Sequence, residues 1–313
     1  GVKVSAAYPG TPSTEISENI VNYPEIYAEW SPNEKVAMEV AIGASISGVR
    51  AMASMKHVGV NVASDPLYTI SYAGVNGGLV LVAADDPGLY SSQNEQDTRC
   101  VARAAMVPVL EPSDSQEAKD FMKYAFDLSE KYDTPVILRT TTRLSHSQGP
   151  VTLEERCEPV DVAYERNVAK FVMMPGNAKQ RHLYVEQRLK DMAKDGYDMP
   201  INKVEINDTK IGFITSGIAY QYVKEACPNA SVLKLGMVHP LPRTLIEEFA
   251  SKVETLYIFE ELEPVFEEQI KSWGIKCIGK EIFTVQGEYS ANMLRKAVLK
   301  EDVDSKAPAQ VPA

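Results

Sequence analysis

Seven consecutive residues near the middle of the first half of the chain carry no charged or polar side chain: Gly78-Leu79-Val80-Leu81-Val82-Ala83-Ala84. The run is too short to cross a membrane as a helix, which takes about 20 apolar residues. It has the length of a fully buried strand, and such strands are typical of parallel sheets covered by helices on both faces. An α/β fold is therefore the expectation for this chain.

The rest of the first 150 residues alternates strand and helix patterns, which supports a parallel sheet. The residues Gly10 to Glu15 read as a loop that enters a helix. The further predicted strands are Val2–Ala7, Arg50–Lys56, Val107–Leu110 and Pro135–Arg139, and the predicted helices are Ser31–Ser47 and Ser115–Lys131.

The pair Gly149-Pro150 ends this first series and predicts two αβ domains. We expect one domain at 1–150, a connector at 151–204 with a helix around Lys179–Lys194, a second domain at 205–300, and a Pro/Ala-rich linker at 301–313. In the second domain the predicted strands are Ile211–Thr215, Ser231–Leu235, Thr255–Phe259 and Gly274–Gly279, and the predicted helices are Ala219–Ala226 and Thr244–Ala250.

The composition excludes several classes of partner. A formal net charge of -11 argues against nucleic acid, which requires a clustered cationic surface; it serves solubility, or it favours a basic partner. The four cysteines, Cys100, Cys157, Cys227 and Cys277, include no close pair, so no zinc or iron–sulfur site is expected. We expect a cytoplasmic protein that does not enter a membrane.

The segment from Ser31 to Ser45 carries the first candidate site residue, Glu34. Ser31 followed by Glu34, with Pro32 between, predicts a capping box with proline at the first helical position. That structural role alone explains Glu34. The helix is also small-sided, which would let a backbone or a flat ligand approach closely, and a glutamate at its start could present a carboxylate to a ring lying across it. The competing Glu39 is expected to face elsewhere. The small residues are Ala37, Ala41, Ala44, Ser45 and Gly48.

Two further segments follow predicted strand ends, where open α/β sheets bind ligands. They are Met55 to Asn61 and Ser91 to Arg99, and their candidates for contact with an anion are Lys56, His57 and Arg99. The alternatives are a hydrogen-bonded, partly buried histidine and a surface ion pair of Arg99.

The adjacent carboxylates Asp85 and Asp86 also follow a predicted strand. Neighbouring side chains at a strand end diverge, so they favour a capped turn over a metal site.

Taken together, these segments and Tyr8-Pro9-Gly10-Thr11-Pro12-Ser13 resemble the thiamine-diphosphate-dependent 2-oxoacid:ferredoxin oxidoreductases over about residues 1–300. Met55 to Asn61 and Ser91 to Arg99 resemble the indolepyruvate branch in particular. The resemblance implies that 1–150 is a pyrimidine-binding domain and 205–300 a transketolase C-terminal-like domain, with the diphosphate-binding domain beyond the linker. It implies these site residues: Glu34, which hydrogen-bonds the aminopyrimidine ring and is catalytic, Gly59 at the cofactor, and Thr11, Lys56, His57 and Arg99 at the substrate.

The function that the resemblance implies is oxidative decarboxylation of an arylpyruvate such as indolepyruvate to an acyl-CoA, with ferredoxin as electron acceptor. The implied cofactors are thiamine diphosphate with Mg²⁺, whose diphosphate site lies outside this chain, and 4Fe–4S clusters in a missing region. The implied partners are a smaller β subunit, ferredoxin, a 2-oxoacid and coenzyme A, in an oligomer. Three alternatives stay open: an enzyme for pyruvate or 2-oxoglutarate, a non-oxidative thiamine-diphosphate decarboxylase, and an inactive scaffold that binds a partner subunit. We expect the fragment alone to be inactive.

Overall fold

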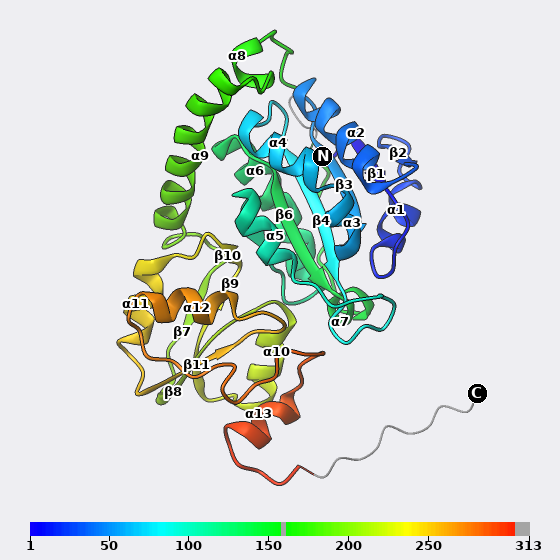
Figure 1. The fold of residues 1–313 in the computed structure, drawn as a ribbon. Coiled ribbons are helices and arrows are strands. Elements are labelled where there is room, and N and C mark those ends of the chain that lie inside the picture. The colour runs from blue at the N-terminus through cyan, green and yellow to red at the C-terminus, as the bar shows by residue number, and fades with distance from the viewer. Residues whose placement is uncertain (158–160, 304–313) are drawn as a thin grey trace, which may run out of the picture.

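The computed structural model describes residues 1–157 and 161–303, which form two sheets surrounded by helices (Figure 1). The larger sheet has the strand order β10-β5-β6-β4-β3-β1-β2, and every pair in it is parallel except β10 with β5. This confirms the predicted α/β fold with mainly parallel sheets. The strands of the larger sheet are β1 (Val4–Ala7), β2 (Tyr27–Trp30), β3 (Ala51–Lys56), β4 (Leu79–Asp85), β5 (Val109–Leu110), β6 (Val136–Thr141) and β10 (Met237–His239).

Helices cover both faces of the larger sheet. Apolar side chains of α2, α3, α4 and α5 belong to the core on one face, and those of α1 and α6 to the core on the other. The helices of this part are α1 (Thr14–Ile20), α2 (Glu34–Ile46), α3 (His57–Val62), α4 (Ser64–Ala73), α5 (Thr98–Ala105), α6 (Ser115–Tyr132) and α7 (Thr142–His146).

Strand β4, which contains the seven-residue apolar run, is buried along its whole length between β3 and β6. Leu79 and Leu81 contribute to the core beneath α2, whereas Val80 and Val82 contribute to the core beneath α6. Because side chains alternate between the two faces of a strand, an uninterrupted apolar run is what a strand with two buried faces requires.

The connector contains α8 (Val168–Phe171) and the long α9 (Pro175–Asp195). Helix α9 runs along the side of the larger sheet toward the second half of the chain (Figure 1). Its Arg188 is buried and donates to the backbone oxygens of Ser71 and Asp133, at 2.6 and 2.8 Å. The helix predicted around Lys179–Lys194 is thus confirmed, and it begins earlier, at Pro175.

The smaller sheet has the order β11-β8-β9-β7, with β7 antiparallel and the other pairs parallel. The predicted strand at Gly274–Gly279 is wrong, since only an isolated bridge joins Ile278 to Tyr257. The elements of this part are β7 (Lys203–Glu205), β8 (Asp208–Ser216), α10 (Gly217–Ala226), β9 (Ala230–Leu235), α11 (Arg243–Ala250), β11 (Thr255–Phe259), α12 (Val265–Ser272) and α13 (Ala291–Ala297).

One strand crosses the predicted domain boundary. β10 belongs to the second half of the chain, yet it pairs with β5 and extends the larger sheet. One hydrophobic core also continues from the larger sheet, at Leu81, to the smaller sheet, at Ile214 and Leu233. Two separate sheets agree with two αβ units, and the limits at 150 and 205 stay a prediction. Most of the expected linker lies outside the described residues, which end at 303.

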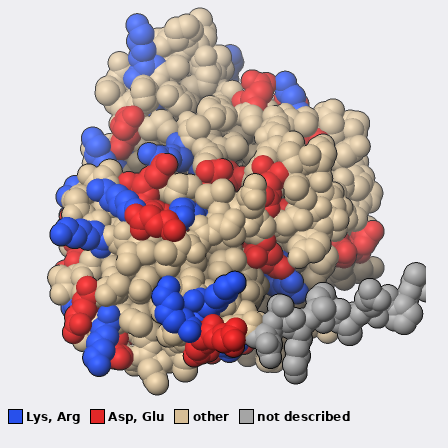
Figure 2. Space-filling model, turned by 60° about the horizontal axis from the view of Figure 1, so that its bottom comes forward, with Lys and Arg blue, Asp and Glu red and all other residues tan. Residues whose placement is uncertain are grey.

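The surface carries charges of both signs. On the face in Figure 2, lysine and arginine side chains lie next to aspartate and glutamate side chains. In the described part of the chain, none of the helices combines the length and apolar character needed to span a membrane.

Candidate functional site

The carboxyl-terminal ends of four parallel strands meet at one edge of the larger sheet. The register pairs Ala7 at the end of β1 with Trp30 of β2 and with Ser54 of β3, and it pairs Lys56 of β3 with Ala84 of β4. The segments that follow these strands therefore emerge side by side, at the place where open α/β sheets bind their ligands. Lys56 is the last residue of β3, and Glu34, Thr11, His57 and Gly59 lie in the segments that follow β1, β2 and β3.

Glu34 is the first residue of α2, and Asn33 caps this helix. The side-chain oxygen of Asn33 accepts a hydrogen bond of 3.0 Å from the backbone nitrogen of Val36. The predicted capping box of Ser31 and Glu34 is therefore wrong. The Ser31 backbone nitrogen instead donates to Ala7 oxygen at 2.8 Å, which continues the β1–β2 pairing past the strand end. Asparagine caps as well as serine does, and it stands directly before the helix.

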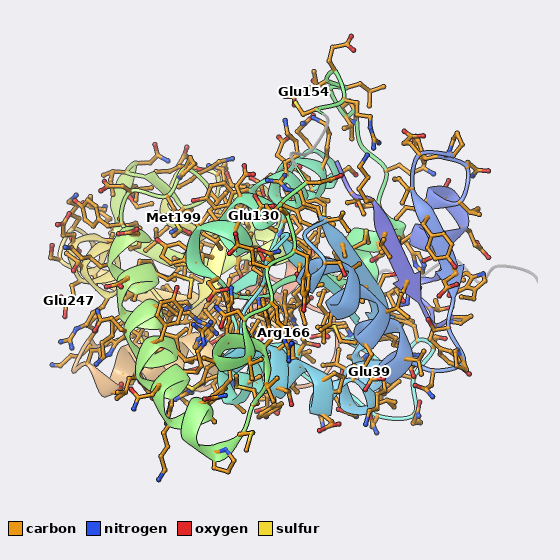
Figure 3. All side chains as sticks on the ribbon, turned by 90° about the horizontal axis from the view of Figure 1, so that it is seen from above. Glu39, Glu130, Glu154, Arg166, Met199 and Glu247 are labelled. Carbon is orange, nitrogen blue, oxygen red and sulfur yellow. The ribbon has the colours of Figure 1, made fainter. Side chains whose placement is uncertain are left out.

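The Glu34 side chain lies against Gly59 of α3. A Cβ atom added to Gly59 would be 2.6 Å from Glu34 Cγ and 2.7 Å from Oε1. Only glycine permits this approach. The Glu34 carboxylate is partly exposed and makes no hydrogen bond or ion pair within the residues described. Glu39, on the same helix, is exposed (Figure 3). The structure thus brings Glu34 and Gly59 together and leaves a carboxylate oxygen available to a ligand.

The other small residues in α2 and just after it contact the protein itself. Ala37 and Ala41 are fully buried, and Ser45 Oγ donates to Gly77 oxygen at 2.5 Å. At Gly48, an added Cβ would be 1.7 Å from the backbone oxygen of Val162. Of the two expected uses of these small residues, close approach of a backbone is what Gly48 shows. The core and the connector occupy these positions, which leaves no space there for a flat ligand.

Thr11 lies in the loop between β1 and α1, and its side chain is exposed. Hydrogen bonds from Gly10 nitrogen to Thr14 Oγ1 and from Ser13 Oγ to Gly10 oxygen, at 2.9 and 2.7 Å, hold this loop. A Cβ atom on Gly10 would be 3.1 Å from Lys56 Cβ. The loop that carries Thr11 therefore lies beside the end of β3.

Lys56 and His57 are buried beneath the long loop that follows β4. Lys56 Nζ donates to the backbone oxygen of Ser91, and His57 Nε2 lies 3.1 Å from the backbone oxygen of Asn94. His57 is only 1% exposed, so it is more deeply buried than the alternative of a partly buried, hydrogen-bonded histidine assumed. Its other ring nitrogen, Nδ1, has no partner among the described residues.

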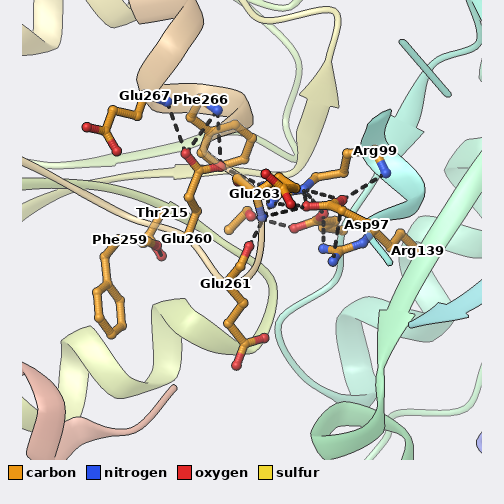
Figure 4. Close-up of polar contacts among 12 residues, drawn as sticks. Asp97, Arg99, Arg139, Thr215, Phe259, Glu260, Glu261, Glu263, Phe266 and Glu267 are labelled. Atoms are coloured by element: carbon orange, nitrogen blue, oxygen red, sulfur yellow. Dashed lines mark hydrogen bonds and ion pairs between the residues drawn. The ribbon is translucent and has the colours of Figure 1, made fainter. Parts of the chain in front are cut away.

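Arg99 is not brought to this group of residues. Its side chain is fully buried in α5, so the alternative of a surface ion pair is wrong. Its nitrogens donate to Asp97, to Glu260 at 2.8 Å, and to the backbone oxygens of Glu261 and Glu263 (Figure 4). Arg99 therefore connects the larger sheet to the segment that follows β11 in the smaller one.

The charged groups at this junction shift one another's pKa values. Burial alone would lower the pKa of Arg99, but Asp97 and Glu260 outweigh it and raise that pKa above its ordinary value. Burial opposes ionisation of Asp97, yet Arg99 and Arg139 lower its pKa to about 2. Arg139 also pairs with Glu111 at 2.6 Å. The sequence offered no signal for this network beyond the segment Ser91 to Arg99, because its partners are far apart along the chain.

Asp85 and Asp86 point to different partners, as divergent strand-end side chains should. Asp85 accepts from Arg139 Nε at 2.6 Å and from Thr98, whereas Asp86 accepts from Ser91 nitrogen at 2.8 Å and from Thr142 Oγ1 at 2.7 Å. Asp86 thus organises the turn after β4. No group of three or more His, Cys, Asp or Glu side chains that could hold a metal ion occurs in residues 1–157 and 161–303.

Comparison with protein families identifies the larger part of the chain. A family model described as pyruvate flavodoxin/ferredoxin oxidoreductase, thiamine-diphosphate-binding, matches residues 1–210. Indolepyruvate oxidoreductase subunit IorA of Pyrococcus abyssi is 48% identical over 297 residues, which are 90% of this chain and 46% of that protein. The subunit of the same name from Archaeoglobus fulgidus is 46% identical over 288 residues, 88% of this chain and 46% of that protein. The chain thus spans about half the length of these curated relatives.

Two solved structures share the fold. A 2-oxoglutarate:ferredoxin oxidoreductase from Magnetococcus marinus, with 2-oxoglutarate, coenzyme A and succinyl-CoA bound, superposes with a TM-score of 0.75 at 16% identity. The match covers 96% of this chain and 62% of that one. A split-gene transketolase, an inactive β4 tetramer, gives a TM-score of 0.59 at 18% identity and covers 95% of this chain and 92% of that one. At these identities the likeness concerns the fold alone.

Proposed function

The chain belongs to the pyruvate flavodoxin/ferredoxin oxidoreductase, thiamine-diphosphate-binding family, and on that premise we propose that it is part of an enzyme that oxidatively decarboxylates arylpyruvates. The substrate is indolepyruvate, the product is an acyl-CoA, and ferredoxin accepts the electrons. The names of the relatives at 46–48% identity support this substrate.

The observation that carries the proposal is the free carboxylate of Glu34 beside Gly59. A family that binds thiamine diphosphate needs a carboxylate that can accept a hydrogen bond from the aminopyrimidine ring. Glu34 fits, because it stands at the ligand-binding edge of the sheet, and no described side chain competes for its oxygens. When bound, the cofactor supplies the carbanion chemistry, and the protein supplies placement and charge.

Glu34 therefore holds the pyrimidine ring and the proton at its nitrogen, and Gly59 keeps the carboxylate in place. Thr11 and Lys56 lie on adjacent segments, and we assign them to the carboxylate of the 2-oxoacid as a hydroxyl donor and a cation. Arg99 we assign to the junction between the sheets, because its donors already have partners there.

The complete enzyme requires groups that are not among the described residues. We propose Mg²⁺ with the diphosphate and 4Fe–4S clusters for the electrons, both held by other parts of the protein. We further propose a smaller β subunit, an oligomeric assembly, coenzyme A and ferredoxin as partners, and a cytoplasmic location.

The test compares Glu34→Gln with Glu39→Gln, an exposed carboxylate of the same helix, in the complete protein with its partner subunit. The measurement is indolepyruvate-dependent reduction of ferredoxin in the presence of coenzyme A. We expect Glu34→Gln to lower turnover by roughly 10²–10⁴-fold, the usual contribution of a general acid–base group. Glu39→Gln should keep normal turnover. Equal activities of the two variants would refute the assignment of Glu34.

A further inference from the structure

Only one of the two ring nitrogens of His57 has a hydrogen-bond partner among the described residues. It is the first residue of α3, and its imidazole is 1% exposed. Nε2 lies 3.1 Å from the backbone oxygen of Asn94, and Nδ1 is buried without a partner in the described part of the chain. A carbonyl oxygen can only accept a hydrogen bond, so Nε2 must carry the hydrogen.

The surroundings disfavour a second hydrogen on the ring. An imidazolium would bury a charged N–H at Nδ1 without an acceptor, which costs free energy. The tautomer of the neutral ring is set by the hydrogen bond that Nε2 makes. Nδ1 then has a lone pair that accepts no hydrogen bond from the described residues.

Glu95, the residue after Asn94, fixes the position of that carbonyl. A single carboxylate oxygen of Glu95 accepts from Gly88 nitrogen at 2.6 Å and from Gly287 nitrogen at 2.9 Å. Gly88 belongs to the same loop, whereas Gly287 belongs to the second half of the chain. Glu95 thus ties the loop over His57 to the segment before α13.

We propose that His57 is a hydrogen-bond acceptor whose Nδ1 receives an N–H donor of the bound ligand, and that Glu95 is the positioning residue that sets its tautomer. The ligand part rests on the proposed function. The donor is either the indole N–H of the substrate or the exocyclic amino group of the cofactor's pyrimidine. His57 therefore does not neutralise a carboxylate, which differs from its expected role as a partner of the anion.

The tautomer is measured by nuclear magnetic resonance on the 313-residue chain with ¹⁵N-labelled histidine. Four histidines give four sets of signals, and the spectrum of His57→Gln assigns the relevant one. We expect the two-bond correlations of an Nε2–H imidazole. An Nδ1–H tautomer would overturn the proposal.

Glu95→Ala and Glu95→Gln test the positioning role with the same signal. Alanine removes both hydrogen bonds, so His57 should show a mixture of tautomers. Glutamine keeps an accepting oxygen and should keep the single tautomer. Gln93→Ala, an exposed residue of the same loop, is the matched control and should change nothing. A single Nε2–H tautomer in folded Glu95→Ala contradicts the role of Glu95.

Two isosteric substitutions in the complete protein test the acceptor. His57→Asn places an oxygen near the Nδ1 position, whereas His57→Gln keeps only a donor near the Nε2 position. An unpaired buried donor on the ligand should cost His57→Gln about tenfold or more in affinity, and His57→Asn less. If the donor is the indole N–H, the loss is confined to indolepyruvate and spares phenylpyruvate, which has no ring N–H. If it is the amino group, the affinity for thiamine diphosphate falls instead.

Normal affinity of His57→Gln for all three ligands means that Nδ1 binds water only, and the acceptor role is then wrong. The tautomer measurement uses neither substrate nor cofactor. It therefore stands even if the proposed enzyme activity fails, and the two failures can be told apart.

Discussion

At the scale of the residue, Glu34 depends on a glycine in another element. Gly59→Ala would place a methyl group 2.6 Å from Glu34 Cγ, so the flexible Glu34 side chain must move away from α3. We expect little loss of stability and a fall in activity of up to about 100-fold, the effect of displacing a reacting group by about 1 Å. The measurements are turnover of the complete protein and thermal melting of the same variant.

Gly43→Ala is the control for that prediction. Gly43 lies inside α2, where an added Cβ meets nothing within 4 Å. Alanine there should raise the free energy of unfolding by about 0.5–1 kcal/mol, because glycine is the poorer helix former. Full activity of Gly59→Ala would show that the Glu34–Gly59 contact has no part in the chemistry.

The raised pKa of Glu261 should make the stability of the protein depend on pH. Burial raises its pKa to about 7, and its partner is the backbone nitrogen of Tyr289 at 2.9 Å. The folded protein therefore binds this proton more tightly than the unfolded chain, whose pKa is near 4.5. By linkage, the contribution of Glu261 to stability is fully present below about pH 4.5 and is lost as the pH rises to about 7.

Glu261→Gln should remove this loss of stability at higher pH. An amide does not ionise, and its oxygen can still accept the hydrogen bond from the backbone nitrogen of Tyr289. We expect the variant to be more stable than the parent near pH 8, with the difference shrinking toward pH about 5. Urea denaturation at a series of pH values measures this difference. Parallel pH profiles of the two proteins would mean that Glu261 is ionised throughout, or protonated throughout, in the folded state.

At the scale of the element, Asn33 caps the start of α2, whereas the sequence predicted Ser31. Asn33→Ala removes the side-chain acceptor of Val36 nitrogen and should cost about 1 kcal/mol of unfolding free energy. Ser31→Ala removes a buried hydroxyl without a partner within the described residues, so it should cost almost nothing. Denaturant unfolding of both variants decides the matter. A larger loss for Ser31→Ala would restore the capping box first expected.

The sequence predicted those elements whose residues share one environment along their length. Strands β3 and β4 are buried throughout, and α6 has regular apolar spacing, so local pattern was sufficient for them. It failed for the edge strand β2, which is mostly exposed and has no such pattern, and for β10, which forms only because β5 leaves an edge open. The same limit applies to the site. Predicted strand ends placed Lys56 and His57 at one edge, and a helix start singled out Glu34. The partners of Arg99 and Glu95 come from residues 260–287, which no local pattern connects to them.

At the scale of the whole molecule, the junction between the two sheets should make them unfold together. The core that continues from Leu81 to Leu233 and the buried ion pairs around Arg99 both cross this junction. Arg99→Met keeps much of the side-chain volume but leaves the carboxylates of Asp97 and Glu260 buried without their cation. Breaking a buried pair in this way costs about 3–5 kcal/mol.

The matched control is Arg143→Gln, which removes a pair between the half-exposed Arg143 and Glu288 across the same junction. Because the arginine of this pair is half exposed, the pair should contribute much less than a fully buried one, about 0–1 kcal/mol, and this variant should melt close to the parent. We expect calorimetry of Arg99→Met to show a single transition at a markedly lower temperature, because one continuous core cannot lose the junction and keep either half. Two separated transitions, or a loss no larger than that of Arg143→Gln, would mean that the halves are independent and that Arg99 is free to act elsewhere. Arg99 would then again be a candidate to bind the anionic substrate.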